Sequence, residues 1–238
     1  MRAVCAIVSR EVRASFLSPT GYIVAALFAV ATGLIFVSKA FDQGQPASMR
    51  TVFEWGTWML LFVCPAISMR AIAEEKRMGT YEMLMSCPVS ERGVIIGKFL
   101  GGMIFLAAVL LPTIVQVFAL ERYGRPDYGE VACGYLGLLL AGAAYLSSGL
   151  LASTLTSSQV VAFLLTLFFW LGFSLAAKLL PGYLPARWAD IAFAADPDPR
   201  LRDFAIGLID TSNIVFFVSL TLLFLIAAAR ALEAGRWR

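Results

Sequence analysis

Long apolar runs alternate with short polar segments along the whole chain. Six of the runs come close to the roughly 20 residues that a helix needs to cross the hydrocarbon core of a bilayer. The first run is too long for a signal-peptide core, so we expect it to remain as a span. The pattern predicts an all-α polytopic membrane protein. Its six transmembrane helices are expected at about residues 20–41, 52–72, 94–120, 131–154, 160–180 and 213–229.

The segment before the first span also has helical periodicity. Val4, Ile7, Val8, Val12 and Phe16 recur at helical spacing, and the arginines at positions 2, 10 and 13 lie around the rest of the helix. This pattern predicts an amphipathic helix over residues 2–17 that lies in the membrane interface. An extension of the first span is the alternative.

The segment between the fifth and sixth spans, residues 181–212, carries a second apolar stripe. It runs through Leu201, Phe204, Ala205, Leu208 and Ile209, at the spacing of one helical face. We expect one or two short re-entrant helices that dip into the outer interface before the last span.

The distribution of Lys and Arg predicts the orientation. With a cytoplasmic N-terminus, eleven basic and six acidic residues lie inside, against eight basic and ten acidic residues outside. Both termini are therefore predicted to be cytoplasmic.

The composition excludes several classes of protein. Apolar residues make up 60% of the chain and charged residues 15%, which is too apolar for a soluble domain or a disordered chain. Six spans leave connectors too short for a folded catalytic domain, so any soluble machinery belongs to another polypeptide. The absence of histidine excludes Ser-His intramembrane proteases and HExxH metalloproteases. The four cysteines form no CxxC pair, so no metal site is expected.

Ionisable residues are confined to the ends of the spans. Glu54, Lys39 and Lys178 all fall near span termini, where long side chains can reach the interface. An ion-coupled carrier that acts alone usually needs an ionisable residue near the bilayer midplane. The sequence therefore argues against that class.

Two stripes of small residues predict close helix packing. Gly93, Gly97 and Gly101 begin the third span at four-residue spacing, and Ala144, Ser148 and Ala152 repeat this spacing in the fourth. Small residues at this spacing let helices approach closely in lipid. Packing within one subunit is favoured over a dimer interface.

The loop between the second and third spans is the strongest functional candidate. It opens with the charge cluster Glu74, Glu75, Lys76 and Arg77. Gly79 and Thr80 then can end one helix and cap another, and a helical turn with Glu82 and Leu84 follows. A short surface helix of this kind suits docking to a soluble partner. A solvated charge cluster that only fixes topology is the alternative.

These residues carry a resemblance to a known family. The string Met69-Arg-x-x-Ala-Glu-Glu-Lys-Arg-x-Gly-Thr-x-Glu-x-Leu, followed by Pro88-Val-Ser and Gly97-Lys-Phe, resembles the membrane subunit of an ABC-2 type transporter. More narrowly, the chain is similar to the gliding-motility-associated permeases. Further matching segments are Ser18-Pro-Thr-Gly-Tyr22, Gly137–Tyr145 and Leu155–Phe163.

The resemblance implies a single ABC-2 type transmembrane domain over residues 1–238, in the bacterial inner membrane. The permease would pair with a second copy or a related permease and with ABC ATP-binding subunits, and it would drive transport, with export as the expected direction. Membrane lipid surrounds it, and no nucleic-acid partner is expected. Glu74 and Glu75 match the family's coupling loop, and residues 79–86 match its coupling helix.

ATP and Mg²⁺ are expected on the partner subunit, with no cofactor in this chain. The segment Gly93-Val-Ile-Ile-Gly97-Lys98-Phe99 is one residue too short between its glycines for a phosphate-binding loop. It also lacks the Ser or Thr that would reach magnesium. The chain is therefore not expected to be an enzyme. A membrane anchor that recruits a cytoplasmic ATPase without transport is the alternative function.

Overall fold

A computed structural model gives the fold of residues 2–39, 48–79, 90–124, 126–183 and 194–235, together with residues 185 and 189. These residues form helices, and none of them lies in a strand. The helices are α1 (Arg2–Leu17), α2 (Pro19–Lys39), α3 (Arg50–Ser68), α4 (Ala73–Arg77), α6 (Glu91–Tyr123), α7 (Tyr128–Leu155), α8 (Gln159–Leu179), the 3-10 turn η1 (Leu180–Gly182), α10 (Pro197–Ala205) and α11 (Thr211–Gly235).

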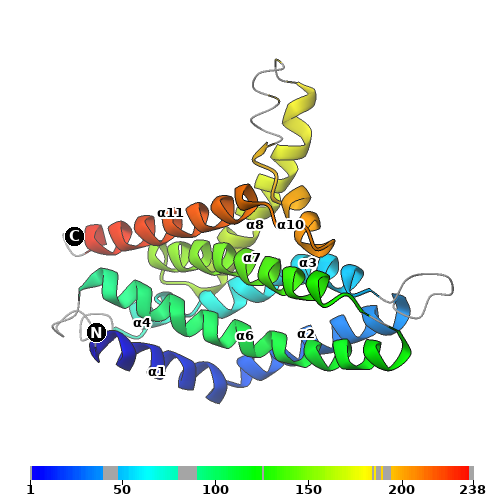
Figure 1. The fold of residues 1–238 in the computed structure, drawn as a ribbon. Coiled ribbons are helices and arrows are strands. Elements are labelled where there is room, and N and C mark those ends of the chain that lie inside the picture. Colours follow the sequence, from blue (N-terminus) through cyan, green and yellow to red (C-terminus); the bar gives the residue numbers. More distant parts are fainter. Residues whose placement is uncertain are drawn as a thin grey trace.

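Six of these helices, α2, α3, α6, α7, α8 and α11, are long and apolar enough to cross a membrane. Each overlaps one of the predicted spans, so the predicted all-helical class and the number of spans are confirmed. The N- and C-terminal ends of the bundle lie at the same end of the molecule, close to α4 (Figure 1).

Helix α7 is the centre of the bundle. It packs against α3, α6, α8, α10 and α11, and most of its length is buried. Its glycines make this possible, because a Cβ at Gly142 would lie 2.3 Å from Leu106 Cδ2 on α6, and one at Gly134 would lie 2.3 Å from the Phe53 ring on α3. Close backbone approach of this kind replaces the hydrophobic effect as the source of helix association in lipid.

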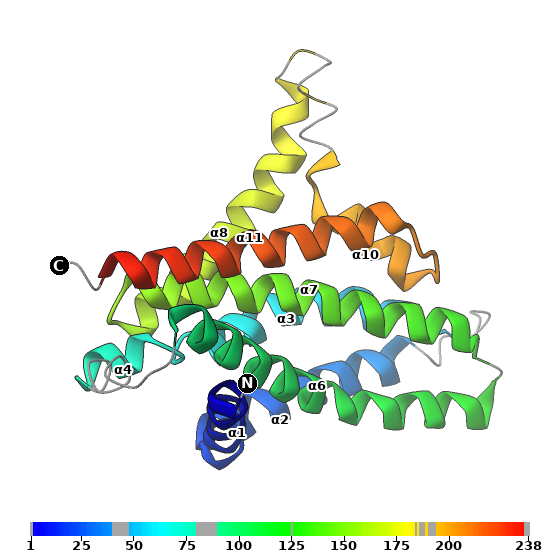
Figure 2. The ribbon, with the colours of Figure 1, turned by 60° about the vertical axis from the view of Figure 1, so that its left-hand side comes forward.

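Helix α8 leaves the bundle at a steep angle and carries η1 beyond it (Figures 1 and 2). Trp170, near the middle of this helix, attaches it to the bundle, because its indole N–H donates a hydrogen bond to Ser148 Oγ on α7 at 2.8 Å. The outward side chains of this helix are large and apolar, including Leu164, Leu165 and Phe168. Such a surface needs lipid or another helix over it.

Helix α10 is shorter than the apolar stripe in its sequence. Leu201, Phe204 and Ala205 are buried, as the helical spacing predicts, whereas Leu208 and Ile209 are exposed. The helix ends before them because Gly207 takes a φ of +83°, which turns the chain out of helical geometry. The predicted stripe over residues 201–209 is therefore wrong in its last turn.

We predict that Gly137→Ala will destabilise the bundle, whereas Gly172→Ala will not. A Cβ at Gly137 would lie 2.6 Å from Phe204 Cβ, which is fixed to the backbone of α10, while a Cβ at Gly172 would meet no atom within 4 Å. Overpacking of this kind costs about 1–3 kcal/mol. The measurement is the melting temperature of each purified variant in the same detergent. Equal melting temperatures for the two variants would contradict the close packing of α10 on α7.

Candidate functional site

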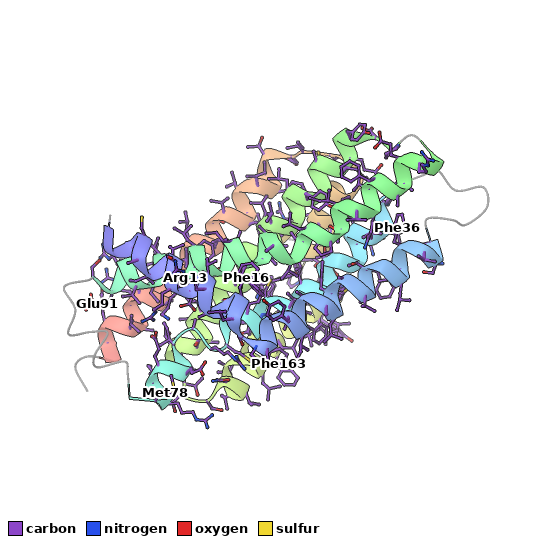
Figure 3. All side chains as sticks on the ribbon, turned by 90° about the horizontal axis from the view of Figure 1, so that it is seen from below. Arg13, Phe16, Phe36, Met78, Glu91 and Phe163 are labelled. Atoms are coloured by element: carbon purple, nitrogen blue, oxygen red, sulfur yellow. The ribbon has the colours of Figure 1, made fainter. Side chains whose placement is uncertain are left out.

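The candidate site surrounds the segment that follows α3. After Ser68 the chain makes a turn over residues 69–72, forms the short helix α4, and approaches α1 and the start of α6. In Figure 3, Arg13 on α1, Met78 after α4 and Glu91 at the start of α6 lie toward one end of the molecule, and Phe36 lies toward the other. The charge cluster thus belongs to the end that carries both termini.

A buried lysine joins the three elements of this site. The Lys98 side chain on α6 is only 2% exposed, and its Nζ lies 3.0 Å from Glu75 Oε1 and 3.4 Å from Glu11 Oε2. Glu75 Oε1 also accepts from Arg10 Nη2 on α1 at 2.5 Å. An ammonium group removed from water needs anionic partners, so these ion pairs fix α1 and α4 relative to α6.

The glycine stripe at the start of α6 allows this approach. A Cβ at Gly97 would lie 2.8 Å from Ile7 Cγ2, and one at Gly101 would lie 2.7 Å from Glu11 Cβ. Both contacts are with α1. These two glycines therefore allow the N-terminal helix of the same chain to pack closely against α6. Gly93 is buried, and its backbone N–H donates to the Ser90 side chain that caps α6.

The other side of α4 is attached to α7. The backbone N–H groups of Ile72 and Ala73 both donate to Ser153 Oγ, at 3.0 and 2.9 Å, and Ser153 Oγ donates to Met69 O at 3.2 Å. These N–H groups belong to the beginning of α4 and have no partner within the helix itself. The buried Ser153 therefore caps a helix that is about 80 residues away in sequence. Lys76 Nζ adds a hydrogen bond to Thr154 O.

A small apolar cluster lies beneath this junction. It contains buried side chains from the turn before α4 and from the neighbouring ends of α6, α7 and α11: Ala71, Ile72, Ile95, Leu150, Ala228, Ala229 and Leu232. The cluster is separate from the main core of the bundle. A displacement of α4 would therefore disturb the ends of three spans.

A cavity of about 490 Å³ opens between α1, α2, α4 and α6. Its charged lining residues are Arg10, Arg70, Lys98, Glu11, Glu74 and Glu75. Among the described residues, no group of three His, Cys, Asp or Glu side chains is placed to hold a metal ion. The site is therefore made of ion pairs and hydrogen bonds between helices.

The predicted coupling residues differ in their surroundings. Glu75 and Lys76 are bonded to other helices, as described above. Glu74 is half-buried and lines the cavity, while Arg77 is exposed. Gly79 is exposed and has a φ of +71°, which suits the chain reversal expected there. Thr80, Glu82 and Leu84, and with them the predicted coupling helix, lie outside the described residues.

The second predicted stripe lies inside the subunit. Ala144, Ser148 and Ala152 are all buried in α7, and Ser148 Oγ holds Trp170 of α8. Within this chain they contribute to helix packing.

Sequence reasoning missed three residues of the site. From the sequence, Lys98 has a place only in the rejected phosphate-loop segment, and Glu11 and Ser153 have no predicted role in a site. One feature of the sequence points to the role of Lys98, namely its position between Gly97 and Gly101. These glycines predict the close approach of another helix, so a cation between them is expected near that helix.

Together, six apolar helices with the buried α7 at their centre, and charged connections at one end, define a multi-pass helical membrane protein. A comparison with known protein families assigns the chain to a narrower class. Residues 37–188 match the family described as ABC-2 family transporter protein. The match covers more than half of the chain, and the chain belongs to the ABC-2 transporter family.

Two curated relatives are similar to part of the chain. Both are called probable multidrug ABC transporter permease YbhR, one from Escherichia coli K12 and one from Escherichia coli O157:H7. Each is 31% identical over 114 residues, which is 48% of this chain and 29% of the relative. The match therefore spans less than a third of each relative's length.

We predict that Lys98→Met will strongly destabilise the protein. The substitution leaves Glu11 and Glu75 without their buried cation, and breaking a buried ion pair costs about 3 kcal/mol or more. The matched control is Lys178→Met, because Lys178 also pairs with a carboxylate, Asp198, but its side chain is 45% exposed. The control should cost less than about 1 kcal/mol. Melting temperatures in detergent measure both effects, and a neutral Lys98→Met would contradict the ion-pair site.

We further predict that Ser153→Ala will release α4 without unfolding the bundle. It removes the acceptor of two backbone N–H groups, so hydrogen exchange at Ile72 and Ala73 should accelerate at least about tenfold, as expected for a lost hydrogen bond. Ser147→Ala is the control, because the buried Ser147 hydroxyl bonds only Ala144 O in its own helix. Unchanged exchange at residues 72–73 in Ser153→Ala would argue against the cap.

Proposed function

We propose that this chain is the permease subunit of an ABC-2 type exporter in the bacterial inner membrane. A separate subunit would bind ATP and Mg²⁺, and its motion would reach the spans through the segment around α4. The permease would act as a dimer with a second copy or a related chain. Its membership in the ABC-2 family supports this assignment.

One observation carries the coupling role. Glu75 on α4 is bonded at once to Arg10 on α1 and to Lys98 on α6, while the beginning of α4 is bonded to Ser153 on α7. A partner that pushes on this segment would therefore act directly on two spans and on the N-terminal helix. Packed and bonded helices are the elements that can transmit such a displacement.

The orientation follows from the basic residues. The end of the bundle with both termini, α4 and the coupling charges is the end predicted to be cytoplasmic. In that orientation α1 would lie in the inner interface, with Arg13 exposed toward the headgroups. Helix α10 would lie at the outer side as a short re-entrant element. Its acidic cap Asp196 accepts from Asp198 N at 3.1 Å.

We predict that Arg77→Glu will weaken assembly with the ATP-binding subunit. Arg77 is exposed at the end of α4, so reversing its charge should change the docking surface and leave the fold intact. Glu75 is less suitable for this test, because its ion pairs also stabilise the fold. The tagged permease would be purified from native membranes in a mild detergent, followed by quantification of the co-purified ATP-binding subunit and its ATPase activity.

The matched control is Arg122→Glu, which reverses an exposed charge at the opposite end of α6. We expect the control to recover the partner at the wild-type ratio and Arg77→Glu to recover at least about fivefold less, the effect of about 1 kcal/mol at an interface. Equal recovery would contradict docking at α4. Assembly with ATPase activity that never responds to the permease would favour a membrane anchor without transport.

A further inference from the structure

The charged side chains that line the cavity beside α1 differ in whether they form ion pairs with the residues that the structure describes. Arg10, Lys98, Glu11 and Glu75 form ion pairs with one another. Arg70 and Glu74 also line the cavity, and neither forms an ion pair with any residue that the structure describes. The cavity thus offers one uncommitted cation and one uncommitted carboxylate.

Arg70 is arranged to receive an anion. Its Nη1 donates to Ser18 Oγ at 3.0 Å, while its Nε is buried and has no hydrogen-bond acceptor in the structure. A buried guanidinium N–H without an acceptor is costly, and a phosphate would satisfy it with a charge-assisted hydrogen bond. The hydroxyls of Ser18 and Thr20 line the same cavity and share a hydrogen bond of 2.6 Å. One of the two hydroxyl protons is used in that bond, and the other can be donated to a phosphate.

The rest of the wall is apolar. Val24 on α2, Ile67 on α3 and Phe105 on α6 line the cavity beyond its charged residues. A ligand that fits the whole cavity therefore combines a compact charged group with a hydrocarbon segment. Its charged group must carry both signs to match Arg70 and Glu74.

We propose that this cavity binds a zwitterionic amphiphile of the phosphatidylethanolamine class. The phosphate lies against Arg70, Ser18 and Thr20, the ammonium pairs with Glu74, and the acyl chain follows Val24 and Phe105. The bound lipid fills the space between α1 and the spans. This site does not depend on the ATP-driven function, because it is built from the permease alone.

The test measures lipid binding to the purified full chain in detergent by native mass spectrometry. Delipidated protein would be titrated separately with phosphatidylethanolamine, phosphatidylglycerol and soluble phosphoethanolamine. We expect one tightly bound phosphatidylethanolamine per chain, and about tenfold weaker binding in Arg70→Gln, the loss expected for one charge-assisted hydrogen bond. Glu74→Gln should weaken the binding of phosphatidylethanolamine but not that of phosphatidylglycerol.

The control is Arg13→Gln, which removes an exposed charge from α1 outside the cavity and should leave lipid binding unchanged. If Arg70→Gln does not fold, Ala66→Leu provides a second test, because it fills the cavity wall and keeps every charge. Equal loss of lipid in Arg13→Gln and Arg70→Gln would overturn the site. Soluble phosphoethanolamine that binds as tightly as the lipid would overturn its assignment to an amphiphile.

Discussion

The end of the bundle that carries both termini depends on one interaction, the ion pairs of Lys98. An ammonium group that is 2% exposed is tolerated only with anionic partners at short distance, and both partners come from other helices. Glu11 therefore holds α1 against the first turns of α6, and Glu75 holds α4 beside them. Both carboxylates and Lys98 also line the cavity between α1 and the spans.

Backbone hydrogen bonding imposes a second, independent constraint on the same segment. A helix as short as α4 leaves most of its N–H groups without intrahelical partners, and its first residues lie buried beside α7. Ser153 supplies the missing acceptor from the end of α7. The segment is thus held by electrostatics on one side and by directional hydrogen bonds on the other.

The features that the sequence predicted are those that depend on local periodicity. Six apolar runs became six long helices, and the stripe over residues 2–17 became α1. The spacing of Gly97 and Gly101 predicted a close approach, yet it could not identify α1 as the partner. The ion pairs of Lys98 could not be predicted, because its carboxylate partners lie 23 and 87 residues away in sequence and only the folded chain brings them together. Leu208 and Ile209 are the opposite case, because local periodicity predicted a helical face there that did not form. Gly207 ends the helix before them, and both side chains are exposed.

The two attachments of α4 respond differently to a displacement. An ion pair weakens gradually with distance, so Glu75 can shift relative to Lys98 and Arg10 and still attract them. Hydrogen bonds weaken steeply as their angle departs from linearity, so the N–H groups of Ile72 and Ala73 must stay aligned with Ser153 Oγ. We infer that a force on α4 would act on α7 through aligned hydrogen bonds and on α1 and α6 through ion pairs that tolerate a small change in distance. Because α7 packs against five other helices, this attachment would carry such a displacement to the centre of the bundle.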